Sequence, residues 1–229
     1  MIAKLRSILF IVIFYGGSTP IIIASWFVSL FSERGTHFMA RVWSRYHYFC
    51  ARWITGVRAQ VIGQLRNAPM LYVFKHESMF ETIDLLRLFE KPVVIAKKEL
   101  LVIPAWGRIA RRHGLVPVDR EGGAGAMRMI IAAGKKAVAD GRPLVIFAEG
   151  SRAHRGERPE LQAGFAGLYK MFGLPIVPVA LDSGKFVPRD TFVQHSGTIT
   201  YAVQPEIPPG LNRDEVRDRV HAAINMLND

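Results

Sequence analysis

This sequence has little cysteine and few acidic residues. Its 229 residues include one cysteine, Cys50, so no internal disulfide can form and a disulfide-stapled secreted scaffold is excluded. The same count excludes a zinc site built on cysteines. Internal repeats and low-complexity linkers are missing, and a hydrophobic content of 50% excludes a disordered chain. A chain of this length is expected to form one domain with a proper core and a short appendage.

Acidic residues are nearly missing from the first third of the chain. Residues 1–76 contain nine Lys and Arg side chains and one acid, Glu33, and the whole chain has a formal net charge of +11. Such an excess favours an anionic partner, which could be nucleic acid, anionic lipid or a phosphorylated substrate. Composition alone does not choose among the three.

A long uncharged segment lies near the N-terminus. No charge occurs between Arg6 and Glu33, but the glycine pair and proline at 16–20 predict a break that leaves two apolar stretches, 8–15 and 21–31. Three interpretations are open: a cleaved signal peptide, one tilted transmembrane helix kinked at the proline, and a helical hairpin in one leaflet. The second apolar stretch favours membrane association. Basic residues on both flanks favour the cytoplasmic face of the inner membrane.

The next segment has the pattern of an amphipathic helix. Arg41, Arg45 and Arg52 share one helical face. The other face is apolar and aromatic: Met39, Val42, Trp43, Tyr46, Phe49, Cys50 and Trp53. This pattern is typical of a helix in a lipid headgroup interface, although a helix that packs on its own domain would also fit. Residues 1–56 are therefore predicted to be a membrane-associated helical region.

From residue 57 onward, short β-branched runs alternate with helical patterns. Buried strands are predicted at 57–62, 71–74, 93–96, 115–118, 144–147 and 176–179, with another strand at 198–203. Helices are predicted near 80–90, 125–140, 163–172 and 212–227. This alternation indicates an α/β domain over residues 57–229, with a largely parallel mixed sheet flanked by helices. Ligands of such sheets bind at the strand ends.

Polar residues that suit acid–base chemistry follow the strand at 71–74. His76 comes directly after it, and Glu81 can pair with its ring if His76 lies in the loop and Glu81 lies in the first turn of the next helix. Ser78 could cap that turn, and Asp84 is a rival for the pairing. The alternative is a solvated histidine in a loop.

Basic residues follow the neighbouring strands. FAEGSR at 147–152 offers a glycine turn, a hydroxyl and the planar fork of Arg152, but it is not a hydrolase nucleophile elbow. Arg120 and Lys97 come after two further strands. The glycines at 122–125 are rejected as a dinucleotide loop. One His–acid pair beside several cations suits proton abstraction from a hydroxyl of an anionic substrate.

These motifs together resemble the 1-acyl-sn-glycerol-3-phosphate acyltransferase family. The family motif His-x4-Asp reads KHESMFE at 75–81, with Glu81 in place of Asp and Lys75 in place of the frequent Asn. A strand that ends in a basic residue reads GLVPVDR at 114–120, and Phe-Pro-Glu-Gly-Thr-Arg reads FAEGSR. The proline between valines reads IVPV at 176–179, and Lys97 is similar to a family lysine. All four motifs occur in family order.

The resemblance implies transfer of an acyl group from a thioester to lysophosphatidic acid. His76 would be the general base and Glu81 would orient it. Phosphate would be bound by Arg120, Arg152 and Lys97; Gly150 and Ser151 would shape the loop, and Glu149 would contact the glycerol. No metal or cofactor is expected. The donor would be acyl-carrier protein or coenzyme A, and the partners would be these substrates and an anionic membrane surface.

Two alternatives remain open at this point. The acceptor could be another lysolipid, such as a lyso-ornithine lipid or lysophosphatidylglycerol. A non-enzymatic basic protein that binds membrane or nucleic acid is the other alternative, but nucleic-acid binding would place basic and aromatic residues on the α/β domain. The densest basic cluster lies beside the apolar segment instead, so no nucleic acid is expected.

Overall fold

The fold is described by a computed structural model that covers residues 1–118 and 123–228. Two long helices, α1 (Ile2–Phe31) and α2 (Glu33–Cys50), come first and lead through the π-helical turn η1 (Ala51–Thr55) into the rest of the chain. The other elements follow in this order: β1 (Val57–Ile62), β2 (Leu71–Phe74), α3 (Met79–Leu88), β3 (Val93–Lys97), η2 (Lys98–Val102), α4 (Trp106–His113), β4 (Val116–Val118), α5 (Gly123–Ala139), β5 (Leu144–Ile146), α6 (Phe165–Phe172), β6 (Ile176–Leu181), η3 (Ser183–Lys185), β7 (Gly197–Val203) and α7 (Arg213–Ile224).

The strands form one seven-stranded sheet in the order β1-β7-β6-β2-β5-β3-β4. Neighbouring strands are parallel except β6 and β7, which confirms the predicted largely parallel mixed sheet. Every residue of β2 and β6 is buried, as expected for central strands that are covered on both faces. The strand predicted at 57–62 is confirmed as β1, but its predicted burial is wrong, because β1 lies at the edge of the sheet and buries only Val57.

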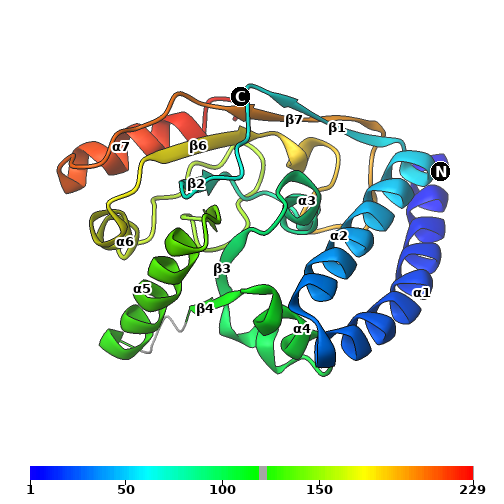
Figure 1. Ribbon diagram of the computed structural model, residues 1–229. Coiled ribbons are helices and arrows are strands. Elements are labelled where there is room, and N and C mark those ends of the chain that lie inside the picture. The colour runs from blue at the N-terminus through cyan, green and yellow to red at the C-terminus, as the bar shows by residue number, and fades with distance from the viewer. Residues whose placement is uncertain (119–122, 229) are drawn as a thin grey trace.

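Helices cover both faces of the sheet (Figure 1). Alternate side chains of β2 point to opposite faces, so Leu71 and Val73 join the core under α5, α6 and α7. Tyr72 and Phe74 join the core under α1, α2 and α3. The helices predicted near 80–90, 125–140, 163–172 and 212–227 correspond to α3, α5, α6 and α7. The short helix α4 was not predicted.

The predicted break at 16–20 is wrong, because α1 continues through Pro20. At Gly17 a Cβ atom would lie 2.1 Å from Tyr46 Oη, so glycine serves helix packing here and not a turn. Gly17 therefore permits close approach of α2, and Tyr46 Oη donates to Ile13 O across the contact at 2.5 Å. The chain reverses at Ser32 instead, where the side chain caps α2 by accepting from Gly35 N at 2.9 Å.

The face of α2 that is buried differs from the apolar and aromatic face that the sequence predicts. Its buried residues are small side chains and histidines: Thr36, His37, Ala40, Ser44, His47 and Cys50. Ser44 Oγ donates to Ile83 O of α3 at 2.7 Å, which fixes this face against the sheet domain. Trp43 and Tyr46 pack on α1, while Phe49 and Trp53 are 57% and 66% exposed. The aromatic stripe is therefore divided between helix packing and the surface.

The helix α1 buries a mixed face and exposes a strongly apolar one. The buried residues are four serines and two phenylalanines: Ser7, Phe10, Phe14, Ser18, Ser25 and Ser29. Trp43 Nε1 donates to Ser18 Oγ at 3.0 Å, so part of this buried face contacts α2. The outer face exposes large apolar side chains: Ile8, Leu9, Val12, Ile13, Tyr15, Ile23 and Phe27. The helix is long and apolar enough to cross a membrane, which is consistent with membrane association.

Candidate active site

The candidate site lies where parallel strands end at one edge of the sheet. Strands β6, β2, β5, β3 and β4 run in the same direction, so the loops that follow them share this edge. The loops contain His76 after β2, residues 147–152 after β5 and Ser183 after β6. Lys97 ends β3. Arg120, which follows β4 in the sequence, lies outside the described residues.

The predicted pairing of His76 with Glu81 has the expected geometry. Ser78 caps α3, with its hydroxyl accepting from Phe80 N at 3.0 Å, and Glu81 is the third residue of the helix. This places His76 in the loop and Glu81 in the first turn. His76 Nδ1 lies 3.0 Å from Glu81 Oε1.

Glu81 is fully buried and accepts hydrogen bonds at both oxygens. Oε1 accepts from the Glu77 and Ser78 amides, each at 2.7 Å, besides His76. Oε2 accepts from Ser78 Oγ at 2.6 Å and from Ser183 Oγ at 2.8 Å. Burial alone would raise the pKa of Glu81, but the hydrogen bond and charge of His76, with the Ser78 donors, outweigh it and lower the pKa. The carboxylate is thus ionised at neutral pH.

The ring of His76 is held on one side and open on the other. It stacks on Phe147 with ring centroids 4.1 Å apart, and its side chain is 15% exposed. With Nδ1–H donated to Glu81, Nε2 has a lone pair and no partner within residues 1–118 and 123–228. This is the arrangement of a general base whose orientation is fixed.

The two other acids near His76 have partners of their own. Glu77 is buried and accepts from Gly184 N at 2.7 Å and from Arg155 at 3.3 Å. Asp84 accepts two hydrogen bonds from Arg87, at 2.6 and 2.8 Å. Neither acid has a hydrogen bond to the His76 ring within the described residues, so Glu81 and not its rival Asp84 pairs with His76.

Glu149 occupies a different position from the one expected for a glycerol contact. It is only 3% exposed, and both of its carboxylate oxygens are already bound. Oε1 accepts from Lys75 Nζ at 2.6 Å, and Oε2 accepts from His76 N at 2.9 Å. The structure therefore places Glu149 beneath the site, in contact with the backbone of His76 rather than with open space.

The rest of the 149–152 loop lies closer to solvent. Gly150 adopts φ +76°, a conformation that favours glycine, and Ser151 is exposed. Arg152 is half-buried, and its carbonyl accepts from Arg189. The loop is joined to the histidine because Ala153 N donates to His76 O at 2.8 Å. Lys97 is exposed at the same edge of the sheet.

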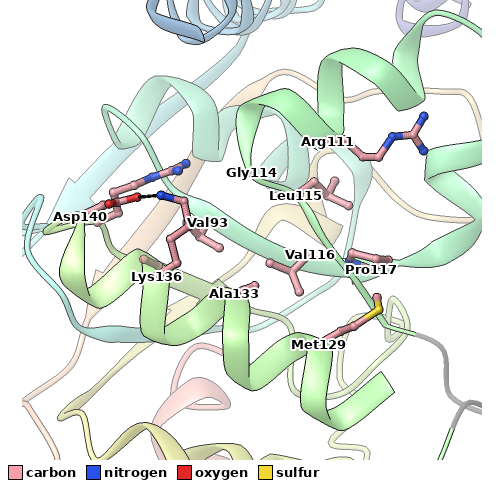
Figure 2. A pocket seen from close by; sticks show the side chains of 12 residues that line it. Val93, Arg111, Gly114, Leu115, Val116, Pro117, Met129, Ala133, Lys136 and Asp140 are labelled. Atoms are coloured by element: carbon pink, nitrogen blue, oxygen red, sulfur yellow. Dashed lines mark hydrogen bonds and ion pairs between the residues drawn. The ribbon is translucent and has the colours of Figure 1, made fainter. Parts of the chain in front are cut away.

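Two cavities differ in their relation to this site. One of about 340 Å³ is lined by residues of α5, β3 and β4, including Val116, Met129 and Lys136 (Figure 2). Val116 belongs to the core on the sheet face opposite that of Phe147, on which the His76 ring stacks. None of the predicted site residues that the structure describes lines this cavity. A second cavity of about 250 Å³ adjoins the His76 loop and is lined by Glu77, Ala153, Gly184 and Arg189, among others.

Two residues of the site were missed in the sequence. Ser183 supplies a hydroxyl to Glu81 from 102 positions away, and its only signal is its place after the predicted strand at 176–179. Lys75 was noted only as a replacement for Asn, yet it is fully buried beside His76. Within the described residues no group of three or more His, Cys, Asp or Glu side chains is arranged to hold a metal ion.

Comparison with known proteins supports the resemblance seen in the motifs. Residues 57–182, which include all the described site residues except Ser183, match the Acyltransferase family. The chain is 28% identical over 170 residues to the 1-acyl-sn-glycerol-3-phosphate acyltransferase of Pseudomonas aeruginosa, covering 73% of this chain and 66% of that protein. It is 34% identical over 130 residues to the protein of the same name from Helicobacter pylori, covering 56% of this chain and 54% of that protein.

A solved structure shares the fold across almost the whole chain. It is the 1-acyl-sn-glycerophosphate (LPA) acyltransferase PlsC from Thermotoga maritima, with a TM-score of 0.77 and 18% identity. The match covers 98% of this chain and 97% of the other, including the region of α1 and α2. On the family match and the strand-end motifs together, this chain is a member of the Acyltransferase family.

Proposed function

We propose that this chain transfers a fatty acyl group from an acyl thioester to the free hydroxyl of lysophosphatidic acid, forming phosphatidic acid in phospholipid synthesis. The observation that carries the proposal is the His76–Glu81 pair, with Nε2 open at the strand-end edge. The relatives from Pseudomonas aeruginosa and Helicobacter pylori bear the name of this activity, and they support the same assignment.

The geometry suits one round of proton transfer. His76 Nε2 removes the proton from the acceptor hydroxyl as the hydroxyl oxygen attacks the thioester carbonyl. The C–S bond then breaks, and the proton passes from Nε2 to the leaving thiolate. Between these steps the ionised Glu81 stabilises the imidazolium. A thioester is already an activated acyl group, so the reaction needs neither an acyl-enzyme nor a metal.

The phosphate of the acceptor is assigned to cations at the same sheet edge. Arg152 follows β5, Lys97 is the last residue of β3, and Arg120 follows β4 in the sequence. In this proposal Gly150 and Ser151 shape the loop that presents Arg152. Acyl-carrier protein and coenzyme A are both anionic, and both are candidate donors.

A panel of lysolipids, each offered with acyl-carrier protein and coenzyme A thioesters, tests the assignment. We expect lysophosphatidic acid to give the highest kcat/KM, because it alone presents an unsubstituted phosphate monoester to the cations. Faster turnover of lysophosphatidylglycerol or a lyso-ornithine lipid would show that this lipid, and not lysophosphatidic acid, is the preferred acceptor. No turnover of any lysolipid would overturn the function.

The variant Arg152→Ala extends this test to phosphate binding. We expect the KM for lysophosphatidic acid to rise about tenfold or more with a smaller change in kcat, because a lost charge-assisted hydrogen bond contributes about 1.5–3 kcal/mol. Lys170→Ala is the matched control, since it removes an exposed positive charge on α6. An unchanged KM for Arg152→Ala would remove this residue from the phosphate site.

We also propose that residues 1–56 attach the catalytic region, 57–229, to the cytoplasmic face of the inner membrane. The outer face of α1 is apolar and exposed, and basic residues flank its uncharged segment, with Lys4 and Arg6 in its first turns and Arg34 just after it. Its inner face is held by the protein at several points: Arg6 Nε donates to Ile54 O at 2.5 Å, and Gln194 N donates to Ser7 Oγ at 2.8 Å. A hairpin of the stretches 8–15 and 21–31 is excluded, because α1 is continuous across both. The contacts favour instead α1 and α2 lying together in one leaflet over a single span.

Vesicle binding tests the attachment surface. The double variant Leu9→Ser and Val12→Ser should bind vesicles that contain phosphatidylglycerol about 10- to 100-fold more weakly. A fully buried aliphatic side chain contributes about 1.5–3 kcal/mol, and only about half of each of these two is exposed to lipid, 49% for Leu9 and 64% for Val12. Met171→Ser with Met226→Ser is the control, because both methionines are about half exposed, at 50% and 52%, on or next to helices of the opposite face. Equal losses in the two double variants would contradict the proposal.

A further inference from the structure

The site contains a buried cation that the proposed reaction does not use. The side chain of Lys75 is 0% exposed, although it lies directly before His76. A buried ammonium is stable only if its charge and its three N–H donors are all compensated. Here all three are: Nζ donates to Glu149 Oε1 at 2.6 Å, to Glu157 O at 2.8 Å and to Asn225 Oδ1 at 2.9 Å.

The carboxylate of Glu149 links the Lys75 ammonium to the backbone of His76. One oxygen binds the Lys75 ammonium, and the other accepts from His76 N at 2.9 Å. His76 O in turn accepts from Ala153 N at 2.8 Å, in the loop that Glu149 begins. Both backbone polar groups of His76 are therefore fixed by the segment 149–153, whose own position depends on Lys75.

The turn that follows α7 supports the same network from the other side. Asn225 Nδ2 donates to His221 O at 2.8 Å, which orients the amide so that Oδ1 faces Lys75. Asn228 donates to Glu157 O at 2.6 Å and accepts from Gly156 N at 2.7 Å. The carbonyl of Glu157 that binds the ammonium is thus itself held in place.

We propose that Lys75 is a positioning residue, which acts through Glu149 to hold the backbone of His76 so that Nε2 meets the acceptor hydroxyl. In this proposal Glu149 is a positioning residue too and does not contact the glycerol. The inference rests on the proposed acyl transfer. Being fully buried, Lys75 touches neither substrate, so its effect falls on the chemical step and not on substrate binding.

The variant Lys75→Met tests this role, because methionine fills a similar volume without the charge. In folded protein we expect kcat to fall about 10- to 100-fold while both KM values stay within about twofold, since small displacements of a catalytic group cost rate. Adding Glu149→Gln removes the carboxylate left unpaired, so the double variant should lose less than the product of the two single losses. Lys136→Met, at an exposed ion pair on α5, is the control.

Asn225→Ala provides a milder variant if Lys75→Met does not fold. It removes one acceptor of the ammonium from a segment whose described residues have no hydrogen bond to His76 or Glu149, and we expect kcat to fall about 3- to 10-fold. An unchanged kcat in a folded Lys75→Met or Asn225→Ala variant would overturn the proposal.

A readout besides activity separates this inference from the proposed function. Diethylpyrocarbonate modifies unprotonated histidines, and the extent of modification at His76 can be followed by mass spectrometry of its peptide. We expect faster modification of His76 in Lys75→Met than in the unchanged protein, with the other histidines unaffected. If the unchanged protein acylates no lysolipid, the function fails, but faster modification at His76 still supports the positioning role; an equal rate overturns it.

Discussion

His76→Ala lowers kcat for acylation of lysophosphatidic acid by about 10³-fold or more. The expected loss is large because Nε2 is the only group that the proposal assigns to remove the hydroxyl proton. Its partner on the other side, Glu81, is bound at both oxygens and cannot move to replace it. The measurement is initial velocity with the acceptor in vesicles or detergent.

His195→Ala is the control for this variant. His195 is exposed, and its backbone amide donates to Phe186 O, so the side chain can be removed without disturbing that contact. We expect its activity to be close to that of the unchanged protein. Turnover by His76→Ala above about one tenth of the unchanged rate would show that another group is the base.

Glu81→Gln lowers kcat by about 10²- to 10⁴-fold without unfolding the protein. The amide oxygen can accept from His76 Nδ1 and the two backbone amides in the place of Oε1. The amide NH₂ can donate to the hydroxyls of Ser78 and Ser183, which rotate to accept. The geometry is thus retained while the charge that stabilises the imidazolium is lost.

Glu81→Asp is the matched comparison, because it keeps the charge and loses one methylene. We expect part of the activity to remain, since the family motif that this region resembles has Asp at this position. Full activity of Glu81→Gln would contradict this role of the charge. Activity of Glu81→Asp no higher than that of Glu81→Gln would contradict it as well.

The pH dependence of stability checks that Glu81 is ionised in the fold. Its pKa lies below the ordinary value of 4.5, so its contribution to the free energy of unfolding is fully present above that pH. The contribution is lost as the pH falls through the lower folded value. The stability difference between the unchanged protein and Glu81→Gln should therefore narrow in acid, and a constant difference would show that the folded pKa is not lowered.

Much of the fold could be predicted because its signals are local. Buried strands such as β2 and β6 read as continuous apolar runs, and the pairing of His76 with Glu81 depends on six neighbouring residues and the cap at Ser78. The continuity of α1 could not be predicted. The role of Gly17 is a close contact with Tyr46, which is far from it in the sequence, so the glycine could not be distinguished from a helix breaker.

The missing parts of the site have the same cause. Ser183 reaches Glu81 across 102 positions, and Asn225 reaches Lys75 across 150. Neither serine nor asparagine carries a pattern that assigns it to a distant carboxylate or ammonium. Glu149 was misplaced for a related reason, because its conspicuous position after β5 does not reveal that Lys75 and His76 already bind both oxygens.

The long reach of these hydrogen bonds also sets an order of events during synthesis. The helices α1 and α2 precede the sheet domain in the chain, so they are translated before it and can pack on each other first. The histidine loop is complete only after β6 has brought Ser183 and the turn beyond α7 has brought Asn225. The proposed membrane attachment can therefore precede the proposed chemistry during synthesis.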